Sequence, residues 1–136
     1  MQEIIKFSEP KFRENPDNIK NSAELFKHIR EIKIDYGQEN MLVFFLDSRN
    51  KLIDYEIMFK GGLNSAVVDA KTLFRRALEH NSNSIIIAHN HPSGILEPSE
   101  EDIDVYAALR KAGNIISIEV VDSIIFNKDH FYSMNK

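Results

Sequence analysis

The chain has 136 residues, of which 43% are hydrophobic and 28% are charged, a balance typical of a single globular domain. Its formal net charge of −4 provides no surplus of basic side chains to neutralise the phosphates of a nucleic acid. The chain has no cysteine, which excludes disulfides and cysteine-based metal sites, and no apolar run long enough to span a membrane.

The first 18 residues differ in character from the rest of the chain. Residues 1–18 contain two prolines and dispersed charges, which predicts an N-terminal arm or poorly ordered extension. They lack the apolar segment of a secretory signal, so we expect a cytoplasmic protein. One folded domain is predicted over residues 19–136. Its first helix should begin at Asn21, which has the spacing of a capping box with Glu24, and should end by Tyr36-Gly37-Gln38.

The middle of the chain alternates between strand and helix patterns. Residues 41–47 (MLVFFLD) predict a buried strand, and residues 52–59 a second strand that forms an antiparallel hairpin with it. Residues 70–80 predict an amphipathic helix, followed by a short apolar strand at 84–88. The apolar side of this helix is expected to carry Leu73, Phe74, Ala77 and Leu78. Its basic residues Lys71, Arg75 and Arg76 favour a solvated helix face over a nucleic-acid patch.

The last third of the chain completes the pattern of an α/β protein. A helix is predicted over 99–112, with Gly113 just beyond its end, followed by a strand over 115–121. Residues 124–126 and 131–133 are expected to close the sheet around the turn at 127–129. Strands and helices thus alternate irregularly and include a hairpin, which predicts an α/β sandwich with a mixed sheet.

The strongest chemical signal lies just after the apolar strand at 84–88. His89 and His91 are two residues apart in an extended segment, so both imidazoles should point to the same side. Pro92 and Gly94 turn the chain away, and Asp102, in the first turn of the next helix, can return to that space. Two imidazoles and one carboxylate leave a fourth position for water, which is the ligand set of a catalytic zinc site.

Two further residues are candidates for the chemistry. Glu39 precedes the strand at 41–47, which the fold should bring beside the histidines, so Glu39 is the predicted general base. Ser99 could donate a hydrogen bond to the developing oxyanion. The run from Ser99 to Asp102 is also an ordinary helix start, and both roles are compatible. Asp47, Asp54 and Glu56 are predicted turn or edge charges, and the other three histidines, His28, His80 and His130, surface residues.

These residues resemble the JAMM (MPN+) signature. The signature is His-x-His, seven residues, then Ser-x-x-Asp, with an upstream Glu, and it occurs here without a gap from His89 to Asp102. The form HNHPSG followed by EPS resembles the bacterial RadC family, long named a DNA repair protein. The resemblance extends from about Ile19 to the C-terminus.

The resemblance implies a cytidine-deaminase-like α/β sandwich of the JAMM type, with Zn²⁺ held by His89, His91 and Asp102. It also implies that Glu39 is the acid/base and that Ser99 assists the tetrahedral intermediate. Two departures are visible. RadC-like chains usually have Asp-His where this chain has Asp122-Ser123, and residues 1–18 are too short for the helix-hairpin-helix-like region of full-length members.

Three functional hypotheses follow. The leading one is a zinc-dependent hydrolase that acts on a peptide or protein substrate through a peptide or isopeptide bond. The second is a nucleic-acid-processing or DNA-repair accessory role, which the family name suggests and the net charge does not support. The third is a non-catalytic zinc-binding interaction module.

Overall fold

Five strands form one mixed sheet in the computed structural model, which describes residues 18–61 and 68–135. The strand order is β2-β1-β3-β4-β5; β3 and β4 are parallel and the other neighbours are antiparallel. The strands are β1 (Asn40–Leu46), β2 (Leu52–Lys60), β3 (Ser84–Asn90), β4 (Glu119–Phe126) and β5 (Phe131–Ser133). The helices are α1 (Ser22–Arg30), α2 (Ala70–Glu79) and α3 (Glu100–Ile116). The predicted mixed α/β fold is confirmed, and none of the described helices is long and apolar enough to cross a membrane.

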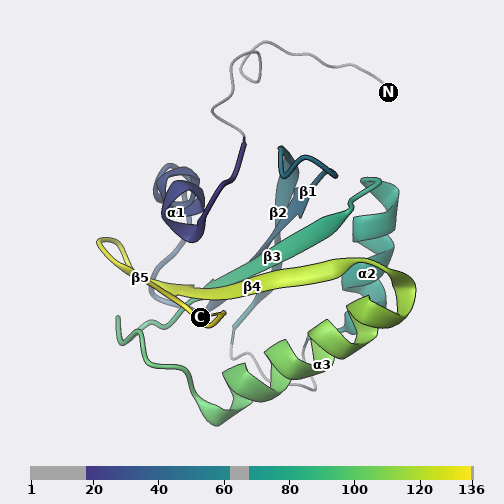
Figure 1. Ribbon diagram of the computed structural model, residues 1–136. Helices are drawn as coiled ribbons and strands as arrows, with labels where there is room; N and C mark the ends of the chain where they lie inside the picture. Colours follow the sequence, from purple (N-terminus) through teal and green to yellow (C-terminus); the bar gives the residue numbers. More distant parts are fainter. Residues whose placement is uncertain (1–17, 62–67, 136) are drawn as a thin grey trace.

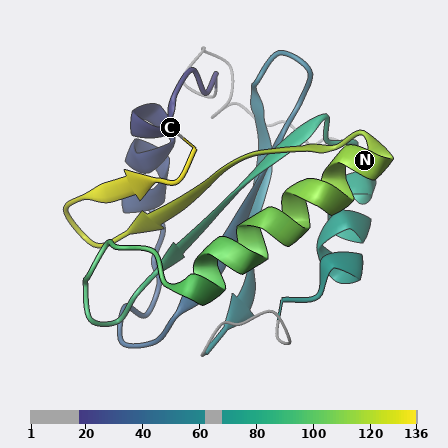
Figure 2. The same cartoon turned by 60° about the horizontal axis from the view of Figure 1, so that its bottom comes forward.

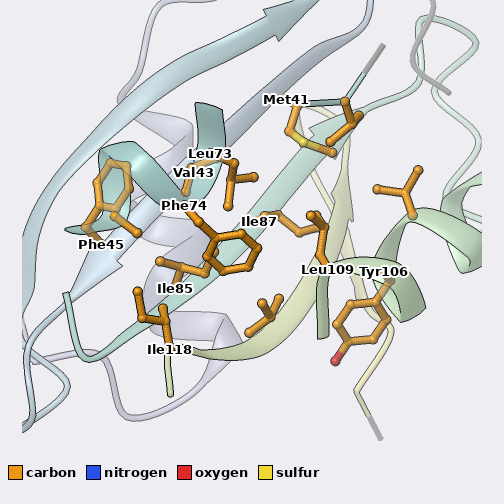
Figure 3. Close-up of a cluster of buried hydrophobic side chains, with 14 residues drawn as sticks. Met41, Val43, Phe45, Leu73, Phe74, Ile85, Ile87, Tyr106, Leu109 and Ile118 are labelled. Carbon is orange, nitrogen blue, oxygen red and sulfur yellow. The ribbon is translucent and has the colours of Figure 1, made fainter. Parts of the chain in front are cut away.

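The helices cover both faces of the sheet, so each central strand is buried on two sides (Figures 1 and 2). Side chains of β1 alternate between the faces: Met41, Val43 and Phe45 point to one, Leu42, Phe44 and Leu46 to the other. The first set packs against α2 and α3 in the cluster drawn in Figure 3. The second packs against α1. Double-sided burial explains why β1 and β3 have apolar runs instead of alternating sequences.

The N-terminal helix begins as predicted and ends earlier. Asn21 is its N-cap and accepts a hydrogen bond from the backbone N–H of Glu24, while the Glu24 carboxylate accepts from the backbone N–H of Lys20. The helix ends at Arg30, before Tyr36. Of the predicted arm, only Asn18 lies within the described residues, and it forms an antiparallel bridge with Lys51.

The predicted end of α3 at Gly113 is wrong. The helix continues to Ile116, and Ser117 takes the left-handed conformation at its C-cap, with φ of 62°. Gly113 is buried within the helix, where a Cβ would lie 2.2 Å from the carbonyl oxygen of Ile118. A glycine is therefore required here for the close approach between α3 and the chain that enters β4, which local sequence patterns do not reveal.

The predicted strand boundaries after α3 are also wrong. Ile115 and Ile116 belong to the last turn of the helix and are exposed, and the strand begins only at Glu119. It then runs unbroken to Phe126 through the polar pair Asp122-Ser123. Asp122 is compatible with burial because it accepts hydrogen bonds from the side chains of Ser22 and Ser133 and from two backbone N–H groups. The predicted closing hairpin of β4 and β5 is confirmed.

Leu78 is a smaller exception to the predicted pattern. It was expected on the apolar side of α2, but it is 59% exposed, whereas Leu73, Phe74 and Ala77 are buried. The buried side of α2 is therefore narrower than predicted and does not include Leu78.

Candidate metal centre

The C-terminal end of β3 places two imidazoles on one face of the sheet. His89 lies within β3, Asn90 is its last residue, and His91 follows. Residues 89 and 91 share the α3 face of the strand, and Asn90 points to the opposite face. The side chain of His89 is only 3% exposed and that of His91 15% exposed. The predicted arrangement of the two histidines is therefore present.

Two carboxylates from other elements approach these imidazoles. Glu39 directly precedes β1, and the antiparallel register pairs Met41 of β1 with His89 of β3. Asp102 lies in the first turn of α3, which returns to the end of β3 after the loop that Figure 2 shows. Glu39, His89, His91 and Asp102 each offer one ligand atom, and these atoms all lie within 4.8 Å of one another. The structure thus brings together the four side chains that the sequence singled out.

Asp102 is held in place by the start of its own helix. Ser99 is the N-cap: its hydroxyl accepts a hydrogen bond from the backbone N–H of Asp102, and Asp102 Oδ2 accepts from the backbone N–H of Ser99. This reciprocal pair is a capping box. It orients the carboxylate so that Oδ1 lies 2.9 Å from His89 Nε2 and Oδ2 lies 3.0 Å from His91 Nε2. Ser99 and Asp102 thus cap the helix and, by the same hydrogen bonds, orient the Asp102 carboxylate towards the two imidazoles.

The second nitrogen of His91 determines what the first can bind. Nδ1 lies 2.7 Å from the carbonyl oxygen of Ile95, and a carbonyl only accepts, so Nδ1 carries the proton. In the neutral imidazole Nε2 is then a bare acceptor, facing the acceptor Oδ2 of Asp102. Two acceptors at this distance require a proton or a metal ion between them. A second nitrogen that donates to a carbonyl is the usual arrangement of a metal-ligating histidine.

His89 provides an independent test of whether a metal fits. Both of its ring nitrogens are buried, and neither makes an aligned hydrogen bond with the described residues, although Nε2 is close to Asp102 Oδ1. Buried polar atoms are normally satisfied. Zinc ligands at about 2.0 Å in a tetrahedron lie roughly 3.3 Å from one another. The two imidazole nitrogens lie 2.9 and 3.0 Å from the two oxygens of Asp102, and one ligand atom from each of the four residues lies within 4.8 Å of the others, so the donors are close enough to share one ion.

The charge of Asp102 is maintained despite burial. Burial by itself raises the pKa of Asp102, but the neighbouring His89 and the two donors of Ser99 lower it by more. The net pKa lies well below the usual range of an aspartate. Asp102 is therefore an anion at neutral pH and a suitable partner for a cation.

A small pocket lies next to the centre, between α3 and the sheet. His89, Asp102 and Ser123 line it together with apolar side chains such as Met41 and Ile87. Ser123 belongs to the pair Asp122-Ser123, for which the resemblance described above implies Asp-His. Its hydroxyl is buried and has no hydrogen-bond partner among the described residues. The departure noted in the sequence thus lies beside the candidate ligands His89 and Asp102.

Sequence patterns missed the role of two other polar residues. Asn90 is fully buried and hydrogen-bonds to residues about 50 positions away, on either side of Glu39. His80, predicted at the surface, stacks on Phe45 with ring centroids 4.2 Å apart and contacts the Glu56 carboxylate. No local signal reveals either role, because the partners come from other strands.

Glu56 and His80 belong to a second charged group, the Arg76 cluster, made of Glu56, Arg76, Glu79 and His80. The Arg76 guanidinium binds the Glu56 carboxylate and also pairs with Glu79. The pKa of Glu56 is lowered, chiefly by its hydrogen bonds to Arg76. Glu56 lies on the edge strand β2, as predicted, and Arg76 is partly exposed on its helix; what the sequence did not predict is that the two form an ion pair.

The sheet topology, the helices on both faces and the Glu, His, His and Asp donors at one end of the sheet define a JAB/MPN-type domain with a JAMM-type candidate metal site. Comparison with known families agrees, since the model of the RadC-like JAB domain matches residues 19–136. This chain belongs to the RadC-like JAB domain family.

Curated relatives of this chain are named UPF0758 proteins. A UPF0758 protein of Clostridium beijerinckii is 36% identical over an alignment that covers 84% of this chain and 59% of that protein. UPF0758 proteins of Clostridium perfringens and Staphylococcus carnosus are 40% and 42% identical, over 73% and 71% of this chain and 44% and 42% of theirs. The chain thus spans about half the length of the curated relatives it matches.

Proposed function

We propose that this domain is a zinc-dependent hydrolase that cleaves a peptide or isopeptide bond. The observation that carries the proposal is the convergence of Glu39, His89, His91 and Asp102, from three separate parts of the chain, within 4.8 Å. His89, His91 and Asp102 would hold the ion, because two neutral imidazoles and one carboxylate are the protein ligands of many catalytic zinc sites. Zinc bound there would act as a Lewis acid and lower the pKa of coordinated water to about 7.

Glu39 is the residue that moves the proton. Its carboxylate belongs to the group of four within 4.8 Å, and the residue is only half-buried. It would accept the proton of the attacking water and later deliver it to the amine that leaves. General catalysis of this kind contributes typically 10²- to 10⁴-fold to the rate.

Ser99 and Asp102 contribute by position. Ser99 is exposed at the N-terminus of α3, where its hydroxyl would donate a hydrogen bond to a substrate oxygen. The helix N-terminus adds a favourable field for negative charge that develops there. Asp102, fixed by the capping box, keeps the ligand set rigid.

A cleavage assay with matched variants tests the proposal. Purified wild type, Glu39→Gln and His89→Ala are analysed for zinc and then incubated with a quenched fluorescent peptide library that includes lysine-linked isopeptides. We expect Glu39→Gln to retain zinc and to cleave at least about 100-fold more slowly. His80→Ala, a histidine variant outside the centre, should cleave like wild type.

Three outcomes would overturn the proposal. Undiminished cleavage by Glu39→Gln would remove the assigned base. Zinc bound at full stoichiometry with no cleavage of any peptide would favour the interaction module. Cleavage of a DNA or RNA oligonucleotide in place of peptides would move the activity to nucleic-acid processing.

A further inference from the structure

Asn90 separates the two histidines in sequence, and its side chain points away from them. It lies on the α1 face of β3 and is fully buried. Its Oδ1 accepts a hydrogen bond from the backbone N–H of Asn40 at 2.9 Å, and its Nδ2 donates to the backbone carbonyl of Gln38 at 3.0 Å. Both bonds cross to the segment that carries Glu39.

These two bonds replace backbone pairing where the sheet ends. The ladder between β1 and β3 stops at the pair Met41 and His89. Beyond it, the side-chain amide of Asn90 offers one donor and one acceptor, as a peptide group does. It hydrogen-bonds the backbone of the residues before and after Glu39. In a parallel ladder, a strand residue likewise bonds two residues of its neighbour that flank a third.

Other contacts hold the same segment from the remaining sides. The backbone carbonyl of Glu39 accepts from the N–H of Gly61 at 2.9 Å. The side chain of Asn40 donates to the carbonyls of Asp35 and Gln38. With Asn90 in place, the backbone at Gln38, Glu39 and Asn40 is therefore fixed at every residue.

We propose that Asn90 is a positioning residue that sets the place of the Glu39 carboxylate relative to the metal ligands. The inference rests on the proposed function, since it assigns Asn90 a part in the work of the general base. The residue that lies between His89 and His91 is well placed for this, because one short segment of β3 then fixes both the ligands and the base. Asparagine suits the position: aspartate lacks the donor, and alanine lacks both groups.

The chain offers a second probe and a control. The Asn40 side chain, equally buried, donates to Asn90 Oδ1 at 3.2 Å and to the carbonyls of Asp35 and Gln38, so Asn40→Ala loosens the same segment and is a second probe of it. Leu25→Ala, in the core around α1, controls for general loss of stability. Asn90→Asp keeps the shape and the acceptor while losing the donor to Gln38, and it serves if Asn90→Ala does not fold.

The first measurement needs no substrate. Amide hydrogen exchange of Asn40 is compared with that of Val43, in the middle of the same strand. We expect Asn90→Ala to accelerate exchange at Asn40 at least tenfold relative to Val43, and the control variant Leu25→Ala to leave the ratio within about twofold. Zinc affinity of Asn90→Ala should stay within about threefold of wild type, because the ligands are not removed. Unchanged exchange at Asn40 would show that Asn90 does not hold the segment.

The second measurement is a double-mutant cycle on the peptide that wild type cleaves best. Asn90→Ala should lower kcat by about 10- to 100-fold with little change in KM, because a displacement of about 1 Å at a reacting group can cost 10² in rate. In the Glu39→Gln background the same change should lower kcat less than twofold. Equal losses in both backgrounds would overturn the inference. If wild type cleaves no peptide, the proposed function fails. Exchange at Asn40 then still decides whether Asn90 holds the segment that carries Glu39.

Discussion

Two groups of histidine and carboxylate side chains lie in this domain, and they are built on different principles. The Arg76 cluster contains its own cation, since one guanidinium binds Glu56 and also pairs with Glu79. At the metal centre, the carboxylate of Asp102 faces two imidazole nitrogens instead. In the neutral ring with Nδ1 protonated, Nε2 of His91 is an acceptor, and both nitrogens of His89 lack an aligned partner among the described residues.

The difference teaches which pattern indicates metal binding. A histidine beside a glutamate does not suffice, as His80 and Glu56 illustrate, because a neighbouring arginine can complete the pair. A ligand set is indicated when buried acceptors face one another and none of the described residues supplies a cation that completes the pair. The centre at His89 meets that condition, and the Arg76 cluster does not.

Among the tests that compare the candidate metal centre with the Arg76 cluster, removal of zinc is expected to have the largest effect on the stability of the protein. An ion bound only by the folded state at 1,000 times its dissociation constant stabilises by about 4 kcal/mol, so chelation should lower Tm by roughly 10 °C. Secondary structure should remain, because the two core clusters lie along the sheet and are built of apolar side chains. Thermal unfolding followed by circular dichroism, with and without chelator, measures both. Loss of the folded signal at 25 °C would assign the metal a purely structural role.

The next largest effect is expected for single histidine variants, which distinguish the candidate metal centre from the Arg76 cluster by their zinc affinity. His89→Ala should weaken zinc binding by more than about 100-fold, since even residues that only orient a ligand contribute 10- to 100-fold. His80→Ala should change the affinity less than twofold. Competition with a zinc indicator gives both values. Comparable losses in the two variants would mean that the Arg76 cluster takes part in zinc binding.

The Arg76 cluster should influence stability modestly and zinc binding not at all. Arg76→Met keeps the length of the side chain and removes the guanidinium from Glu56 and Glu79. The pair is partly exposed, so we expect a loss of about 1 kcal/mol in the free energy of unfolding by urea. A change in zinc stoichiometry in this variant would contradict the separation of the two groups.

The smallest expected effect is the pH dependence of that loss. The pKa of Glu56 is lowered in the folded state, mainly by its hydrogen bonds to Arg76. Its contribution to stability is therefore complete above its ordinary pKa of 4.5 and is lost as pH falls through the lower folded value. The stability difference between wild type and Arg76→Met should thus be constant from pH 6 to 8 and shrink below pH 4.5. A difference that grows on acidification would refute this interpretation of Glu56.

The candidate site was predictable from the sequence because its signals are local. His89, His91, Ser99 and Asp102 lie within one stretch of 14 residues, and the strand period and helix start determine where they point. To predict that Glu39 belongs to the site, the pairing of β1 with β3 must also be known, because Met41 lies opposite His89 in that register. The resemblance to the JAMM signature supplied that link before the fold was known.

What the sequence did not reveal depends on contacts between distant elements. Gly113 has the local pattern of a helix end, and only the approach of Ile118 explains why it lies inside α3. Asn90 looks like a loop residue until its partners beside Glu39 are known. His80 has no ligand-like spacing, yet the stacking on Phe45 and the bond to Glu56 place it inside the structure. In each case the decisive neighbour comes from another strand or from the far end of a helix.

The most direct test of the account is a crystal structure of the zinc-loaded protein with anomalous data collected at the zinc edge. The account predicts one strong anomalous peak about 2.0–2.2 Å from a nitrogen of His89, a nitrogen of His91 and a carboxylate oxygen of Asp102, with Glu39 beside it. An absent peak in protein equilibrated with zinc, or a peak located at Glu56 and His80 instead, would contradict it.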